Sequence, residues 1–370
     1  MPPPLWVGIM NTTIPNYIRA VMQNTLRNRK WTAWMQAKGR ITYNWSGYWA
    51  DWPVQFAEAP IQGYADNMAV TFPQRNYWKK VALGWRGFIA TDSMTYQQRL
   101  MNSGNEAIID RYNSIIPMLM QGMTQKFGDQ VYLDGELAAN LLLFHGIESF
   151  MSNSGASTRQ PIMLPNDTYA GQSCTLGNAG GSWTLNGANT EWPSGTGDPE
   201  YDFWSPLIVN YTSTVAQSLG GWSAPTGSKT WPNTCREAIR YGIMNQQRND
   251  MAEDNLDMIV LELPLFRQFK DKVEASERIV VNKEDGLWKL GFKDVMNYDG
   301  VDITFEYGVP ANVGYGFSMK NAEIRSQQPE LVVKHGPEED ITDLSIKFLM
   351  SNFGNFCFNP RRHVKFVAGG

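Results

Sequence analysis

The sequence predicts an α+β fold, in which helices and extended strands are mixed along a chain of 370 residues. Three observations favour it. Apolar residues recur at helical spacing over about seven turns from Ser103 to Val131. Aromatic and short alternating runs typical of strands fill Ile41 to Ile89, and a further alternating run spans Leu344 to Met350. This length allows two ordinary domains, or one large domain with extended arms.

The N-terminal segment is strongly basic. The first 50 residues carry six basic side chains and no acidic one, whereas the remaining 320 residues carry 26 basic and 36 acidic groups. The spacing predicts a helix from Ile14 to Lys38, with Pro15 in its first turn and Gly39 after its end. A positive arm on a negative body indicates docking on a neighbour's acidic surface, on nucleic acid or on the chain's own body.

The segment from Ile41 to Ile89 is predicted to form extended strands joined by a long hairpin. Eight of the 14 tryptophans lie in the first 85 residues. A pair of strands is only marginally stable in water and cannot bury so many rings by itself. The aromatic hairpin therefore needs a partner surface.

The long helix is predicted to begin at a capping box formed by Ser103 and Glu106, and Pro117 and Gly122 should bend it. A short helix from Glu136 to His145, with Leu141 to Phe144 buried, should follow. Residues 152–232 are rich in Gly, Ser, Thr, Asn and Trp, which is typical of irregular loops and short strands. The later expected elements are a helix capped by Thr234 and ending near Gln247, a strand from Met258 to Leu261, a helix beginning at Pro264, a strand from Val301 to Tyr307 and an end to strand pairing at Pro360.

The sequence contains no pattern for catalysis or metal binding. The three histidines are isolated, the three cysteines are odd in number and far apart, and phosphate-binding and nucleophile-elbow motifs are absent. The acidic residues Glu338, Glu339, Asp340 and Asp343 favour a solvated turn over a cation site. We therefore expect no catalytic, cofactor-binding or metal-binding residue. No stretch reaches the roughly 18 apolar residues of a membrane span, so no membrane partner is expected.

The tryptophan content fits two kinds of protein. Tryptophan rings stack on sugars, which would suit a carbohydrate-binding or glycan-degrading protein, and they also anchor protein interfaces. Composition does not choose between these readings.

Four stretches carry a resemblance to the major capsid proteins of tailed double-stranded DNA bacteriophages, the Hong Kong 97-type family, over most of the chain. The segment from Asn102 to Asp110, with the end of its helix near Asp129 to Gly135, is similar to that family's spine helix. Three further stretches resemble the passage into the axial domain, the later strands and turns, and the closing strand with its basic tail: His145–Ser149 with Asp202–Pro206; Asp257–Val260 with Leu290–Phe292 and Asp299–Val301; and Gly354–Asn355 with Asn359–Arg362.

The resemblance implies a division of the chain. Residues 1–40 would form a basic N-terminal arm, and residues 41–94 an extended loop with the start of a peripheral domain. Residues 95–140 would hold the spine helix of that domain. Residues 141–340 would form an axial domain containing the long loop region 152–232, and residues 341–370 would return to the peripheral domain as a closing strand and tail.

The resemblance also implies a function: a capsid subunit that assembles with itself, as hexamers and pentamers, into an icosahedral shell around double-stranded DNA, in the cytoplasm of a bacterial host and then in the virion. Portal and scaffold or decoration proteins, and non-specific contact with packaged DNA, would be its other partners. A tail-tube or decoration subunit is the alternative among virion proteins. The residues expected at subunit contacts are Arg27, Arg29, Lys30, Trp31, Trp34, Trp45, Trp49, Trp52, Arg361 and Arg362.

Overall fold

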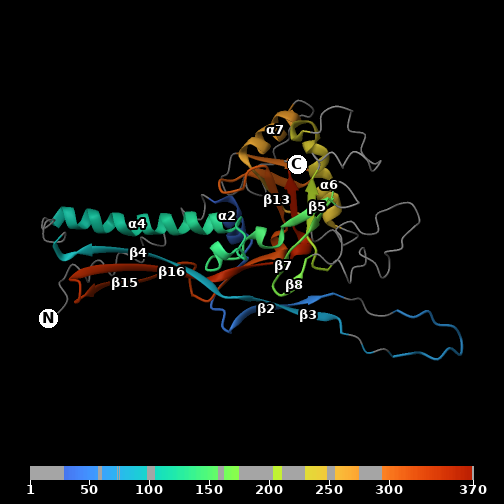
Figure 1. Ribbon diagram of the computed structural model, residues 1–370, viewed down its shortest axis with the longest axis horizontal. Helices are drawn as coiled ribbons and strands as arrows, with labels where there is room; N and C mark the ends of the chain where they lie inside the picture. The colour runs from blue at the N-terminus through green and yellow to red at the C-terminus, as the bar shows by residue number, and fades with distance from the viewer. Residues whose placement is uncertain are drawn as a thin grey trace.

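The computed structural model describes residues 29–56, 61–72, 74, 76–97, 105–156, 162–174, 203–210, 230–247, 255–274 and 294–368. Two sheets organise the chain (Figure 1). One follows the long axis of the molecule beneath a single long helix, and the other stands in a more compact part together with two helices. A hairpin projects away from both sheets.

The elongated part is a five-stranded sheet covered on one face by α4 (Asn105–Gln130). Its central strand pairs with β4 along ten residues, with β15 in its first half and with β14 in its second half, and β1 extends the sheet in parallel. The strands are β1 (Ile41–Thr42), β4 (Arg86–Thr95), β14 (Ala322–Ser326), β15 (Val333–Asp340) and the central β16 (Ser345–Phe358). Ile116 and Met120 of α4 pack against Ile346, Phe348 and Met350, so the alternation of β16 gives it one apolar face for the helix.

The compact part is an eight-stranded sheet in the order β11-β12-β10-β13-β17-β9-β6-β5. The strands are β5 (Asn153–Ala156), β6 (Ile162–Pro165), β9 (Leu207–Asn210), β10 (Met258–Leu261), β11 (Val295–Tyr298), β12 (Val301–Phe305), β13 (Val313–Phe317) and β17 (Val364–Val367). Every residue of β9 and β10 is buried, as expected for strands in the interior of a covered sheet. Helices α6 (Trp231–Gln247) and α7 (Leu263–Glu274) pack on it through one apolar cluster.

A cluster of aromatic side chains joins the two parts. Trp31, on the short helix α2 (Lys30–Ala37), is fully buried and lies 5.5 Å from Phe356 of the five-stranded sheet and 5.7 Å from Phe317 of the eight-stranded sheet, between ring centroids. The remaining elements are β2 (Trp49–Gln55), β3 (Trp78–Gly84), the small pair β7 (Thr168–Tyr169) and β8 (Gln172–Ser173), and the 3₁₀ turns η1 (Ala138–Asn140), η2 (Ile147–Phe150), η6 (Met319–Asn321) and η7 (Pro360–Arg362).

Most predicted elements are confirmed. The strand pair within 41–89, the long helix, the helix at Pro264, and the strands at Met258 and Val301 are all present. The helix predicted from Ile14 is described only from Lys30, and Ser103 of the predicted capping box lies outside the described residues.

Three details of the prediction are wrong. Residues 136–145 form turns around η1 rather than an α-helix, and Leu142 is 80% exposed because a turn does not present one buried stripe. Thr234 lies inside α6, where its hydroxyl donates to the carbonyl of Thr230, so it does not cap the helix. Strand pairing resumes after Pro360, because β17 follows the turn η7 and pairs with β13 and β9.

Two sets of strand pairings cross residue 340, the expected boundary between the axial segment and the closing strand. β14 and β15 lie within 141–340 but pair with β16 in the five-stranded sheet. β17 lies within 341–370 but joins the eight-stranded sheet between β13 and β9. Both sheets thus contain strands from before and after residue 340, and the expected division into domains stays a prediction.

Candidate functional site

The projecting hairpin is the most exposed apolar feature of the described chain. β2 and β3 pair antiparallel over seven residues, from Trp49 opposite Gly84 to Gln55 opposite Trp78, and Phe56 continues the pairing by donating to the carbonyl of Tyr77. Beyond this point residues 61–72 are all exposed. Gln62 donates to the carbonyl of Thr71 over 2.9 Å, so the two sides of the loop remain tied.

Large apolar side chains line this loop and the hairpin. Ile61 is 95% exposed and Phe72 is 92% exposed. The other exposed members of this set are Tyr48, Trp49, Tyr64, Met68, Val70 and Trp78. Large apolar side chains exposed in this number on one feature are typical of an interaction site.

The inner face of the hairpin, by contrast, is packed against its own chain. Trp52 lies 6.4 Å from Trp204 and Phe56 lies 6.0 Å from Phe203, between ring centroids. The ammonium group of Lys79 lies over the rings of both Phe56 and Phe203, at 4.9 Å and 4.8 Å. The hairpin is thus fixed at its base on one face and uncovered on the other.

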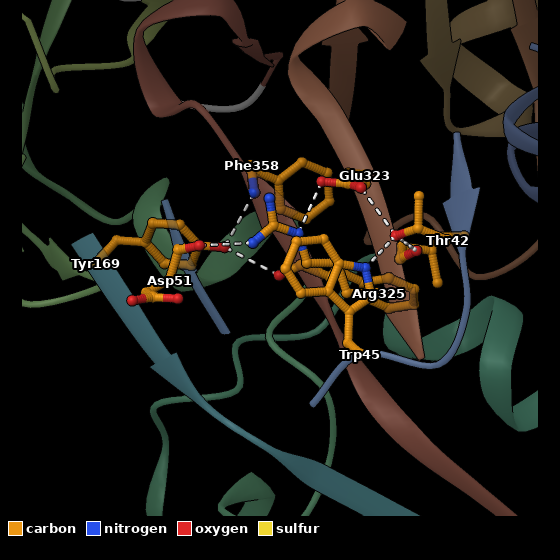
Figure 2. Close-up of polar contacts among 9 residues, drawn as sticks. Thr42, Trp45, Asp51, Tyr169, Glu323, Arg325 and Phe358 are labelled. Carbon is orange, nitrogen blue, oxygen red and sulfur yellow. Dashed lines mark hydrogen bonds and ion pairs between the residues drawn. The ribbon is translucent and has the colours of Figure 1, made fainter. Parts of the chain in front are cut away.

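Arg325 of β14 fixes the direction in which the hairpin leaves the body (Figure 2). Its guanidinium lies over the rings of Trp45 and Trp52 at 4.3 Å and 5.3 Å. It donates to the backbone carbonyl of Asp51 over 2.9 Å and to the carboxylate of Glu323 over 2.7 Å. The buried guanidinium of Arg325 therefore connects the five-stranded sheet to the backbone of β2 and to the rings of Trp45 and Trp52.

The chain leading into the hairpin is tied to the same residues. Thr42 of β1 donates its hydroxyl to Glu323 over 2.8 Å and accepts from the indole nitrogen of Trp45 over 2.7 Å, as Figure 2 shows. The backbone N–H of Trp45 donates to the carbonyl of Ser326. Together these bonds tie the segment that enters the hairpin to β14 and hold the hairpin base in place.

A pocket of about 370 Å³ opens beside this base. It is lined by residues from the segment before β1, from β2, from η6 and from the ends of β14 and β16, among them Arg40, Trp52, Val54, Lys320, Glu323 and Phe358. With Arg325 included, its lining carries three cationic groups and one acidic group.

Two basic residues of the arm, Arg29 and Lys30, dock on the chain's own body. Arg29 donates to the carboxylate of Asp129 over 3.0 Å and to the carbonyl of Tyr307 over 2.5 Å. Lys30 donates to the hydroxyl of Thr304 and the carbonyl of Phe305 over 2.7 Å and 2.8 Å. Three docking surfaces were considered for the arm, and these two residues contact one of them, the body of their own chain.

A buried carboxylate holds the start of α2. Glu306 accepts from the backbone N–H of Trp31 over 3.0 Å, and burial raises the pKa of its carboxyl to about 7 despite the nearby charges of Arg29 and Lys30. Trp31 and Trp34 lie in the core that α2 helps to form, with exposed fractions of 0% and 5%. Because their rings are already buried within this chain, Trp31 and Trp34 offer almost no surface for the predicted contact with a neighbouring subunit.

The other residues expected at subunit contacts differ in their exposure to solvent. Trp49 is half exposed on the outer side of β2, whereas Trp45 and Trp52 are partly covered by Arg325. Arg361 and Arg362 lie in η7, partly buried, and Arg27 lies outside the described residues. The role of Arg325 at the hairpin base was not predicted from the sequence. The only local signal is that Glu323 and Arg325 lie two residues apart, on the same face of a strand.

The described residues contain no group of three or more His, Cys, Asp or Glu side chains placed to hold a metal ion. The acidic residues of 338–343 lie at the turn between β15 and β16, where Lys347 pairs with Asp340 and with Asp343. None of the helices that the structure describes has both the length and the apolar character needed to span a bilayer.

Comparison with solved structures finds similar folds in proteins of two capsids. The chain is similar to a protein of the cyanophage A-1(L) capsid asymmetric unit, with a TM-score of 0.58 and 13% identity over 89% of this chain and 90% of that one. It is also similar to the capsid of the native GTA particle, with a TM-score of 0.52 and 9% identity over 91% and 90% of the two chains. No protein-family model matches the sequence, and no curated protein matches it.

Proposed function

From the Hong Kong 97-type capsid fold that this chain has, we propose that it is the major capsid subunit of a tailed bacteriophage. Copies of it assemble into an icosahedral shell around double-stranded DNA, and its role is structural and not catalytic. The five-stranded sheet with α4 is the peripheral domain, and the eight-stranded sheet is the axial domain, with the two exchanges of strands described above.

The β2–β3 hairpin is the observation that carries this proposal. Its base is fixed by Arg325, while Trp49, Ile61, Phe72 and Trp78 are exposed on a feature that projects from the body. Burial of apolar surface contributes about 25 cal/mol per Å², so these side chains stabilise an assembly only when a neighbouring copy covers them. A stable shell contact needs more than about 1,000 Å² of buried surface, which a projecting hairpin of this length can provide.

The partners follow from the same role. The chain binds itself in hexamers and pentamers, and portal, scaffold or decoration proteins complete the particle. Its contacts with packaged DNA are not sequence-specific. Such contacts run through phosphate and are sensitive to salt, whereas the body of the chain carries excess acid.

Negative-stain microscopy and light scattering of the purified chain test the proposal. Closed shells are expected, whereas tubes, trimers or persistent monomers that bind polysaccharide would contradict it. A second variant tests the hairpin: residues 57–76 are replaced by Asn-Gly, which closes the Phe56–Tyr77 pair with a two-residue turn. This variant should fold but form no shells.

A matched control separates the hairpin from exposed apolar surface in general. Leu142→Ser changes an 80% exposed leucine far from the hairpin in sequence and should leave assembly unchanged. Ile61→Ser combined with Phe72→Ser should reduce assembly without altering the fold of the subunit, measured by circular dichroism. Normal shells from the shortened hairpin would refute its role.

A further inference from the structure

The pocket beside the hairpin base contains a cation without a partner. The side chain of Arg40 is only partly exposed, and within the described part of the chain its guanidinium has no hydrogen bond or ion pair. Arg325, in contrast, donates to the carboxylate of Glu323 and to the carbonyl of Asp51. The pocket thus offers one unsatisfied guanidinium beside an apolar wall of Trp52, Val54 and Phe358.

This lining selects the chemistry of its occupant. Three cationic groups against one carboxylate favour an anionic ligand, and the apolar wall favours a ligand that also carries an aliphatic or aromatic side chain. A volume of about 370 Å³ holds one or two side chains and not a folded domain. An acidic turn with an exposed aliphatic residue at its tip meets these requirements.

The turn between β15 and β16 has this composition. Residues 338–347 contain four acidic side chains and one lysine. Ile341 is 88% exposed and Leu344 is 62% exposed, which places apolar side chains at the tip of the turn.

The same turn is held rigid by its own hydrogen bonds. Asp340 accepts from the backbone N–H of Thr342 over 2.9 Å and pairs with Lys347, and Leu344 has a positive φ of 48°. The carbonyl of Leu344 accepts from the backbone N–H of Tyr96 on the neighbouring strand. A turn that is already ordered loses little conformational entropy when it binds.

The turn cannot reach the pocket of its own chain. It precedes Ser345, the first residue of β16, whereas Phe358 at the other end of the same strand lines the pocket. The 14 residues of β16 span 13 steps of roughly 3.3 Å, which separates the two ends by about 43 Å. In Figure 1 the paired ends of β15 and β16 accordingly lie away from the β2–β3 hairpin.

We propose that the β15–β16 turn of one copy inserts Ile341 into the pocket beside the hairpin base of a neighbouring copy, with Glu338 or Glu339 facing Arg40. The inference rests on the proposed function and specifies one of its contacts. Because the two surfaces differ, the contact is head-to-tail, and such contacts repeat around a ring when the rotation closes.

Disulfide crosslinking in assembled particles tests this contact. One variant carries Val54→Cys and a second carries Ile341→Cys, both in a Cys357→Ala background because the native Cys357 also lines the pocket. The two are mixed before assembly and oxidised afterwards. A crosslinked dimer is expected from the mixture and not from either variant alone, and Leu142→Cys mixed with Val54→Cys should give none.

The outcomes separate this inference from the proposed function. Shells that form without the 54–341 crosslink overturn the inference and leave the capsid role intact, whereas absence of shells from the unmodified chain overturns the role itself. A charge reversal gives a second measurement. Arg40→Glu should lower the assembled fraction at least tenfold, and adding Glu338→Arg should restore it. If Arg40→Glu instead assembles normally but encloses less DNA, nucleic acid occupies the pocket and the inference fails.

Discussion

The guanidinium of Arg325 lies over the indole ring of Trp45, 4.3 Å from its centroid. This contact belongs to the crossing where the projecting hairpin meets the five-stranded sheet, and it depends on a planar group that can stack and donate at the same time. Lysine has the charge but neither the plane nor the fork of donors.

Arg325→Lys should therefore loosen the hairpin base. The Glu323 carboxylate and the carbonyl of Asp51 each lose a donor in a largely buried place, which should lower the free energy of unfolding by about 1 to 3 kcal/mol. Urea denaturation of the unassembled subunit measures the loss. Lys80→Ala, which removes the exposed ion pair to Asp51, is the control and should leave the midpoint unchanged. Equal midpoints for all three chains would contradict the role given to Arg325.

The ion pair between Lys365 and Glu148 should behave as a buried pair. The Lys365 side chain is 8% exposed, and its ammonium also donates to the carbonyl of Met151 over 3.1 Å. Lys365→Met leaves Glu148 buried without a counter-charge and should cost about 3 kcal/mol of stability. Combining it with Glu148→Leu should recover most of the loss, because an apolar pair of similar size avoids the desolvation penalty.

Thermal and urea denaturation of the single and double variants measure this coupling. The exposed pair of Arg240 with Asp299 supplies the comparison. Asp299 has a positive φ of 50°, which asparagine tolerates, so Asp299→Asn should cost less than about 1 kcal/mol. A double variant as unstable as Lys365→Met alone would show that the site requires the ions themselves.

Glu306 should make stability depend on pH near neutrality. Burial raises the pKa of its carboxyl to about 7, whereas the same group in the unfolded chain has its ordinary pKa of 4.5. Between these values the folded chain keeps a proton that the unfolded chain has released, so the contribution of Glu306 to stability falls as pH rises. Glu306→Gln removes this dependence and keeps an acceptor for the N–H of Trp31.

The difference in unfolding free energy between Glu306→Gln and the unsubstituted chain should thus shift in favour of the variant by up to about 3 kcal/mol from pH 4.5 to pH 8. Burial lowers the pKa values of His145 and His363 to about 4, but both chains share these groups and their contributions cancel. A difference that is constant with pH would contradict the raised pKa of Glu306.

Local patterns predicted most of the secondary structure but little of the pairing. The alternation around Ile346 and the apolar spacing of Leu265, Phe269 and Val273 appear in the structure because each depends on one face of one element. The pairing of β14 and β15 with β16 depends on residues that lie near each other only after folding, so no local pattern contains it.

Local patterns were also insufficient to predict the whole candidate site. The hairpin was predicted from its aromatic strands, and the exposed side chains of its loop agree with the need for a partner surface. Composition could not tell which tryptophans the chain buries itself: Trp31 is enclosed by Phe317 and Phe356, whereas Trp49 is half exposed. Arg325 was missed because its role comes from rings and a carbonyl supplied by another part of the chain.

The position of β17 has a consequence for synthesis. It lies between β9 and β13 and is the strand through which β5, β6 and β9 connect to β10 through β13. Until a ribosome has released residue 367, the two halves of this sheet expose open edges to each other and to other nascent chains. A prematurely terminated product that lacks β17 therefore cannot join the two halves of the sheet and leaves both edges unpaired.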